Sequence, residues 1–183
     1  MIPVWLVRHG EAAAKWAEHP DPGLSALGIE QAERAAEQLL PQLTGPVTIL
    51  SSPKVRAMET ARPLEQRLAA KLSVAPAFRE IEAPVPLGQR QVWLRAFMQQ
   101  SWKEQSETQW QWRTGIVNAL KAVDGPTVIF THFLVINAAV AHCRDADATL
   151  QCCPDNGSVH RFAVDEGGVS VLQLGKEMPS LVG

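Results

Sequence analysis

Arg8, His9 and His132 lie at the ends of short apolar runs of this sequence, and Arg56 lies one turn into the helix predicted after another such run. In open α/β sheets, the carboxyl ends of the strands form the crevice that binds ligands, so we expect these side chains to surround one small volume. Two guanidinium groups and two imidazoles favour a compact multivalent anion. Phosphate fits best, because planar guanidinium groups pair with its oxygens bidentately.

Two histidines beside such an anion indicate chemistry as well as binding. A neutral imidazole is a competent nucleophile toward phosphorus, and the arginines would neutralise the oxygens during transfer. The leaving oxygen then needs a proton donor. A carboxyl group next to phosphate keeps its proton more readily, which suits a general acid near neutral pH. Glu80 and Glu82 both follow a candidate strand, and both are candidates for this acid.

The elements that must position these residues alternate between strand and helix patterns. The predicted strands are short apolar runs, at residues 2–7, 47–50, 73–78, 127–131, 159–163 and 169–174. Pro76 makes the third of them an edge strand. Alternation of this kind predicts an α/β fold, a three-layer α/β/α sandwich with a mostly parallel central sheet.

Three helices are predicted between these strands. Ser25 caps the first, which runs to about Leu40 with Leu27 on its apolar face. Pro53 opens the second, and Pro63 is expected to kink or split it. An apolar helix at residues 133–143 directly follows His132.

Composition limits the classes of protein. The chain has 183 residues, of which 46% are hydrophobic and 20% charged, with a formal net charge of −2. These values are typical of one soluble domain, and they speak against a broad nucleic-acid-binding surface. The run at residues 2–7 is too short for a signal peptide, and no apolar run approaches the length that spans a bilayer. We therefore expect a cytoplasmic protein with neither a membrane nor a nucleic acid as partner; the oligomeric state stays open.

The three cysteines do not form a recognisable metal site. Cys143, Cys152 and Cys153 match no zinc-ligand spacing and are expected to be free thiols.

Several motifs together resemble the histidine phosphatase superfamily, the phosphoglycerate-mutase-like proteins. They cover residues 2–163 and are carried by Arg8, His9, Gly10 and Glu11, by Leu24, Ser25, Gly28, Gln31 and Ala32, by Ser51, Ser52, Pro53, Arg56, Ala57, Thr60 and Ala61, by Phe78, Arg79, Glu80 and Ile81, by Thr131 and His132, and by Asn156, Gly157, Ser158 and Val159. The resemblance implies a single domain over residues 1–183.

The resemblance also implies roles for the site residues. His9 would be phosphorylated transiently, while Arg8, Arg56 and His132 hold the phosphoryl group. Glu80 would protonate the leaving group and later help to activate water. No metal ion and no organic cofactor would be required.

Residues 84–122 match the family poorly and are predicted to form a helical lid over the site. Four of the six tryptophans lie there: Trp93, Trp102, Trp110 and Trp112. A lid rich in aromatic and poor in charged residues favours a substrate with an apolar or stackable leaving group.

These patterns predict a metal-independent phosphatase that hydrolyses small phosphomonoesters through a phosphohistidine at His9. The alternatives are a phosphoglycerate-type phosphomutase and a non-catalytic module that binds phosphate or a protein. The second alternative rests on Phe133, which follows His132 where the family usually has glycine.

Other polar residues are interpreted structurally. Glu11 stabilises the loop after His9, and Ser51 and Ser52 serve as caps and donors, because no Gly-x-Ser-x-Gly elbow surrounds them. The remaining histidines, His19, His142 and His160, are expected to be structural or on the surface.

Overall fold

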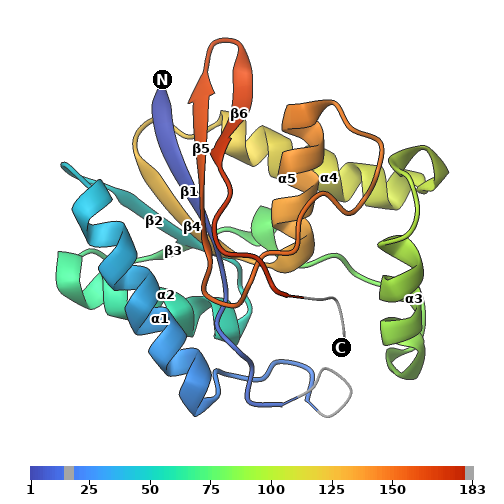
Figure 1. Ribbon diagram of the computed structural model, residues 1–183, viewed down its shortest axis with the longest axis horizontal. Coiled ribbons are helices and arrows are strands. Elements are labelled where there is room, and N and C mark those ends of the chain that lie inside the picture. The colour runs from blue at the N-terminus through green and yellow to red at the C-terminus, as the bar shows by residue number, and fades with distance from the viewer. Residues whose placement is uncertain (15–18, 180–183) are drawn as a thin grey trace.

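A central sheet organises the computed structural model, which describes residues 1–14 and 19–179 (Figure 1). The described residues form six strands in the order β3-β2-β4-β1-β5-β6. The strands are β1 (Ile2–Arg8), β2 (Thr48–Ser51), β3 (Ser73–Val74), β4 (Thr127–Thr131), β5 (Val159–Asp165) and β6 (Gly168–Gln173). The pairs β3-β2, β2-β4 and β4-β1 are parallel, whereas β5 and β6 form an antiparallel hairpin at one edge. The prediction of a mostly parallel sheet is confirmed.

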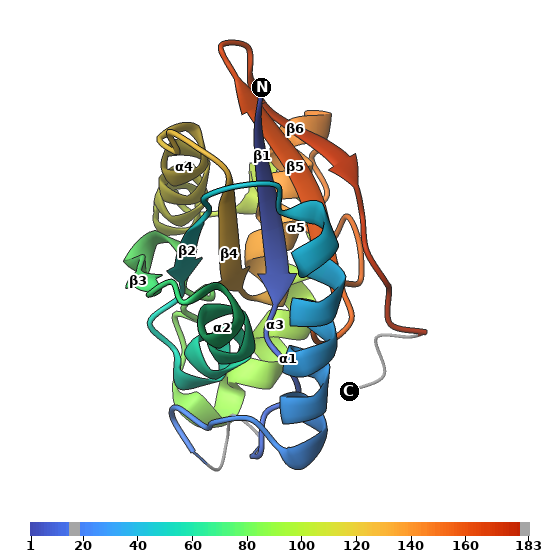
Figure 2. The same cartoon turned by 90° about the vertical axis from the view of Figure 1, so that its left-hand side faces the viewer.

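Helices cover both faces of the sheet. The longer ones are α1 (Ala26–Leu39), α2 (Val55–Leu68), α3 (Arg90–Phe97), α4 (Glu107–Lys121) and α5 (Phe133–Arg144). Short 3-10 turns lie at Leu40–Gln42, Pro76–Phe78, Leu87–Gln89 and Trp102–Glu104. Helices α1 and α2 lie on one face and α4 and α5 on the other, while α3 lies at the end of the molecule where β1 ends (Figures 1 and 2).

Alternating side chains of the strands build a separate core on each face. Val4 and Leu6 of β1 pack on the α4–α5 side, and Trp5 and Val7 pack on the α1–α2 side. Strands buried on both faces read as continuous apolar runs, which is why the sequence predicts them well.

The helices differ from the predictions in three places. Leu27, expected to be inward, is 43% exposed, because the helical period places it on the side of α1 opposite the buried Ala36. Helix α2 begins at Val55 rather than at Pro53. It also runs unbroken past Pro63, so the predicted split is wrong. A proline removes one backbone donor, and the burial of Pro63 beside Leu64 holds the helix together.

The third predicted strand is shorter than expected, since only Ser73–Val74 pairs with β2. It lies at the sheet edge, as predicted, and Pro76 opens the 3-10 turn that follows. Within the described residues, no helix is long and apolar enough to cross a membrane.

Candidate active site

The two histidines of the site follow neighbouring parallel strands. Arg8, the last residue of β1, is the register partner of Thr131, the last residue of β4. The next residue of each strand is a histidine, so His9 and His132 lie side by side, with ring centroids 5.2 Å apart. The pairing of β1 with β4 thus produces the geometry that the sequence predicted at the strand ends.

The loop after β1 is held by close packing and one hydroxyl group. A Cβ on Gly10 would lie 2.5 Å from the carbonyl oxygen of Gly28, so backbone packs directly on backbone. The N–H of Gly10 donates to the Thr60 hydroxyl of α2 at 3.0 Å, and that hydroxyl donates to the Arg56 carbonyl. One side chain therefore links the loop that carries His9 to the helix that carries Arg56.

Arg56 fixes the protonation of both histidines. Its Nε lies 3.2 Å from His9 Nε2, and its Nη2 lies 3.3 Å from His132 Nδ1. A guanidinium group only donates, so both imidazole nitrogens must be acceptors without hydrogen. The hydrogen of His9 is then on Nδ1, which donates to the Gly10 carbonyl at 2.7 Å, and that of His132 is on Nε2, which donates to the Ser52 hydroxyl at 2.7 Å.

Burial keeps these imidazoles neutral. Desolvation lowers the pKa of His9 well below its ordinary value, and the charges of Arg8 and Arg56 lower it further. The pKa of His132 is lowered in the same way, first by burial and then by His9, Arg56 and Lys54. At neutral pH, His9 Nε2 is therefore unprotonated, and its lone pair accepts from Arg56 Nε.

Arg8 is held from three sides. Its Nη1 donates to the Pro154 carbonyl at 2.8 Å and lies 3.2 Å from the Met178 sulfur, while its guanidinium lies over the Phe133 ring at 5.2 Å from the centroid. Burial lowers the pKa of Arg8 to about 10, so it stays charged. Its Nε is buried and has no hydrogen-bond partner within the described residues. A buried donor of this kind is suited to an incoming acceptor.

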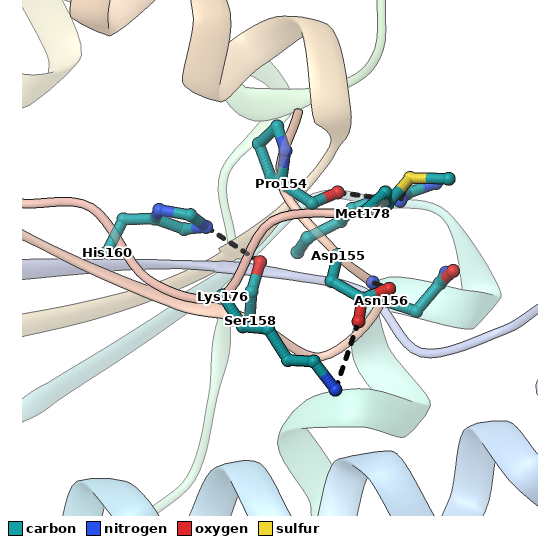
Figure 3. Close-up of polar contacts among 8 residues, drawn as sticks. Pro154, Asp155, Asn156, Ser158, His160, Lys176 and Met178 are labelled. Carbon is teal, nitrogen blue, oxygen red and sulfur yellow. Dashed lines mark hydrogen bonds and ion pairs between the residues drawn. The ribbon is translucent and has the colours of Figure 1, made fainter. Parts of the chain in front are cut away.

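Residues 175–179, which we name the C-terminal strap, bring Met178 to Arg8. Figure 3 shows the strap beside the turn that carries Pro154 and Asp155. The N–H of Met178 donates to the Cys153 carbonyl at 2.8 Å, and Lys176 Nζ lies 3.6 Å from the Asp155 carboxylate. The last described residues of the chain thus support a side chain of its first strand.

The carboxyl group of Glu80 lies inside the site. It accepts from the N–H groups of Ile81 at 3.2 Å and of Leu134, in the first turn of α5, at 3.3 Å. Burial raises its pKa, against the lowering effect of these N–H groups and of Arg56 and Arg8. Glu82, by contrast, has a side chain that is 78% exposed and pairs with Arg79 at 3.8 Å.

The segment that carries Glu80 is tied to the sheet. The Thr131 hydroxyl, at the end of β4, donates to the Phe78 carbonyl at 2.6 Å. Glu80 is therefore positioned by the same strand that positions His132.

The residues interpreted structurally have structural contacts. Glu11 accepts from the Ser25 hydroxyl at 2.8 Å and so joins the loop to the cap of α1. His160 is fully buried, accepts from the Gly175 N–H at 2.9 Å and contacts the Ser158 hydroxyl at 2.7 Å (Figure 3). The thiols of Cys143, Cys152 and Cys153 are free. In the part of the chain that the structure describes, no group of three or more His, Cys, Asp or Glu side chains could hold a metal ion.

Sequence reasoning missed two residues near the site. Asn156 donates to the His9 carbonyl at 3.3 Å; its motif was noticed, but no contact with His9 was predicted. Arg90 begins α3, where its charge acts on Arg56 and is itself influenced by Glu80. Nothing in the local pattern marks Arg90, since only the path of the 84–122 segment brings it to the site.

Comparisons with known proteins match one family model and several solved structures. A family model described as "Histidine phosphatase superfamily (branch 1)" matches residues 4–177. A search of curated proteins found no match. Among solved structures, Bacillus stearothermophilus YhfR is similar with a TM-score of 0.77 and 21% identity, over 94% of this chain and 96% of that one.

Two further structures show the same likeness. A putative α-ribazole-5′-P phosphatase from Escherichia coli has a TM-score of 0.74 at 18% identity, over 99% of this chain and 100% of that one. A phosphoserine phosphatase from Entamoeba histolytica has a TM-score of 0.72 at 18% identity, over 97% and 98%. At these identities the likenesses establish a shared fold.

Proposed function

Because the chain belongs to the histidine phosphatase superfamily (branch 1), we propose that it hydrolyses small phosphomonoesters through a phosphohistidine on His9, without a metal ion. The observation that carries the proposal is the hydrogen bonding of His9. Its Nδ1 bonds to the Gly10 carbonyl, and its Nε2 faces the donors of Arg56. The imidazole is thereby held in the tautomer whose free nitrogen can attack phosphorus.

The arginines and His132 form the phosphoryl-binding set. A phosphate oxygen is a better acceptor than an imidazole nitrogen, so a bound phosphomonoester would take over donors of Arg56. The unpartnered Nε of Arg8 supplies a further donor. The N-terminus of α5, which begins directly after His132, adds backbone N–H groups and a favourable dipole.

The reaction balances over two steps. In the first, His9 Nε2 attacks phosphorus as the bond to the leaving oxygen breaks, and Glu80 gives that oxygen its proton. In the second, the Glu80 carboxylate takes a proton from a water molecule whose oxygen attacks phosphorus. The P–N bond then breaks, phosphate leaves, and His9 and Glu80 regain their starting states.

The position of Phe133 supports an active enzyme over a binding module. Phe133 is the first residue of α5 and has helical backbone angles, which any L-residue adopts without strain. Its ring packs on the guanidinium of Arg8, so it helps to hold that group in the site. The change from the family's glycine therefore does not disturb the described backbone.

Relatives of the same fold support the substrate class. Two of the similar structures are named as phosphatases, of phosphoserine and of α-ribazole-5′-P. Both names describe phosphate esters of small molecules with quite different leaving groups. This diversity supports hydrolysis of a phosphomonoester by the present chain and leaves its leaving group to be determined.

The test is hydrolysis of p-nitrophenyl phosphate in the presence of EDTA. We expect His9→Ala to lower kcat/KM by about 10⁴-fold, the usual scale for loss of a nucleophile. His142→Gln, a change in α5 outside the site, serves as the control and is expected to retain activity. Activity that survives His9→Ala, or that EDTA abolishes, would contradict the mechanism.

A second measurement identifies the intermediate and the reaction type. Rapid acid-free quenching is expected to trap an acid-labile phosphoryl group on the wild-type protein and none on His9→Ala. A wild-type protein that binds phosphate but hydrolyses nothing would support the binding module. Isomerisation of 3-phosphoglycerate without net release of phosphate would instead support a mutase.

A further inference from the structure

The aromatic side chains of the 84–122 segment pack on one another. The Trp102 ring contacts Phe97 and Trp110 at centroid distances of 5.7 and 5.3 Å, and Arg113 lies over both indoles at 4.8 Å. Trp93 stacks on Phe97 at 5.3 Å. These contacts explain the tryptophan-rich composition as internal packing. The preference for an apolar or stackable leaving group, expected from the composition, stays a prediction.

A cation of the same segment lies on the backbone beside the candidate acid. Arg90 Nη2 is 3.5 Å from the Ile81 carbonyl, and the N–H of Ile81 donates to the Glu80 carboxyl group. Arg90 is half-buried at the first position of α3. The guanidinium of Arg90 and the carboxyl group of Glu80 thus both contact the backbone of Ile81.

Arg90 interacts electrostatically with charged residues of the candidate active site. Burial lowers its pKa, while the charges of Glu80 and Glu82 raise it. Arg90 in turn contributes to the lowered pKa of Arg56. It therefore lies within electrostatic reach of both the phosphoryl-binding arginine and the acid.

The leaving group must occupy this same side of the site. Glu80 can protonate the leaving oxygen only from hydrogen-bond distance, so the rest of the leaving group extends from phosphorus toward the Glu80–Ile81 backbone. In the proposed function, Arg8 and Arg56 already donate hydrogen bonds to the phosphoryl oxygens. Arg90 therefore adds a positive charge on the leaving-group side of the site, beyond the charges that bind the phosphoryl group.

Resting on the proposed function, we propose that Arg90 binds a second oxyanion, a carboxylate or a phosphate, on the leaving group of the substrate. The substrate class is then a small phosphomonoester with a second negative charge a few bonds from the ester oxygen. Binding of that anion also offsets the positive charge of Arg90, which otherwise favours the ionised form of Glu80. The contact would thus select the substrate by the second charge of its leaving group.

Two matched substrate pairs test the proposal. 3-Phosphoglycerate and glycerol 3-phosphate differ by a carboxylate in place of a hydroxymethyl group. Propane-1,3-diol bisphosphate and its monophosphate differ by the second phosphate, so the pairs separate the two kinds of anion. We expect wild-type kcat/KM to favour the anionic member of at least one pair about tenfold or more, the scale of a charge-assisted hydrogen bond.

Variants assign that preference to Arg90. Arg90→Met is expected to lower kcat/KM for the favoured anionic substrate about 30-fold and for its neutral partner less than threefold, and Arg90→Lys to restore part of the loss. Arg95→Met, an exposed change in the same helix, is the matched control and should leave the preference intact. Equal losses for both members of each pair, or a preference that survives Arg90→Met, would overturn the proposal.

Calorimetric binding separates failure of this inference from failure of the proposed function. The titrations use the same four compounds and the His9→Ala protein, which cannot turn them over. If nothing is hydrolysed but the anionic compounds bind in an Arg90-dependent way, the phosphatase proposal fails and the subsite stands. If Arg90→Met changes neither affinity nor hydrolysis, the subsite is refuted, whether or not the enzyme is active.

Discussion

At the scale of single residues, two neighbouring carboxyl groups have opposite environments. Glu80 is withdrawn from water against the first turn of α5, while Glu82 extends into solvent beside Arg79. Burial and the N–H groups of the turn act on Glu80 in opposite directions, and burial is the larger effect, so its pKa is raised. A proton held above the usual range of a glutamate is what a general acid near neutral pH requires.

The pH dependence of turnover tests this role. In the proposed mechanism the first step needs protonated Glu80, so kcat for an alkyl phosphate is expected to fall as pH rises through the raised pKa of Glu80. Glu80→Gln is expected to remove this descending limb and lower kcat by about 10²- to 10⁴-fold. The loss is expected to be smaller with p-nitrophenyl phosphate, whose leaving group needs no proton.

Glu82→Gln is the matched control, since it removes the neighbouring carboxyl group by the same chemistry. Its pH profile and kcat are expected to match those of the wild type. If kcat of Glu80→Gln still falls as pH rises, another group is responsible for that fall. If Glu82→Gln loses the fall instead, Glu82 and not Glu80 is the general acid.

The site was predictable where it depends on strand ends. His9 and His132 follow apolar runs that must pair as buried parallel strands, so their meeting is a consequence of topology. The choice between Glu80 and Glu82, and the presence of Arg90, depend on which side chains become buried by an irregular segment. The hydrophobic periodicity of the sequence does not predict that burial, because residues 79–89 form neither a strand nor an α-helix.

At the scale of elements, the contact between the β1–α1 loop and α1 leaves no space for side chains. A Cβ on Gly28, in the first turn of α1, would lie 2.2 Å from the Glu11 carbonyl oxygen. Gly10 meets Gly28 from the other side. The position of His9 therefore depends on two glycines that approach one another, and neither has an unusual backbone angle that would require glycine by itself.

This contact predicts a large effect of one methyl group. Gly28→Ala is expected to lower the free energy of unfolding by about 3 kcal/mol, at the upper end for overpacking, because both partners are backbone atoms. The displaced loop carries His9, so kcat is expected to fall as well. Urea unfolding and hydrolysis of p-nitrophenyl phosphate measure the two effects.

Gly115→Ala is the matched control. Gly115 lies within α4 and a Cβ there would meet nothing within 4 Å. Alanine is the better helix former, so this change is expected to stabilise the protein by up to about 1 kcal/mol. A Gly28→Ala protein as stable as the wild type would show that the loop moves away freely, contrary to the close packing described.

The sequence predicts correctly which helices and strands form, and less well where they begin and which side chains they bury. Leu27 and Pro63 are the instructive cases, since Leu27 is exposed instead of inward and α2 is not split at Pro63. The apolar character of Leu27 did not decide its burial, and Pro63 lies buried inside an α2 that continues to Leu68. Both are decided by tertiary contacts that a local pattern does not contain.

At the scale of the whole molecule, buried neutral histidines link stability to pH. The pKa of His160 is lowered to about 4 by burial, and those of His9 and His132 are lowered as well. The unfolded chain therefore binds protons that the folded protein excludes. Stability is full above the ordinary histidine pKa of about 6.5 and is lost as the pH falls from there toward 4.

His160→Asn isolates one of these contributions. Asparagine keeps an acceptor for the Gly175 N–H but cannot titrate. We expect the variant to be less stable than the wild type at pH 7.5, and its unfolding free energy to fall less steeply between pH 6.5 and 4. Between pH 6.5 and 4, the wild type is expected to lose up to about 3 kcal/mol more unfolding free energy than the variant, at 1.36 kcal/mol per pKa unit.

Urea unfolding at four pH values across this range measures the slopes. Parallel curves for the two proteins would show that His160 takes no part in the acid-induced loss of stability. Wild-type stability that rises toward pH 4.5 would contradict the linkage of all three histidines.

The central place of β1 in the sheet has a consequence for synthesis on the ribosome. Ile2–Arg8 leaves the exit tunnel well before its partners β4 and β5, and the strap that supports Arg8 emerges after both. The nascent chain must therefore carry an unpaired apolar strand until β4 and β5 have emerged, and during that time the strand is open to chaperones and to aggregation. For the same reason, the imidazole of His9 meets that of His132 only after β4 has emerged and paired with β1.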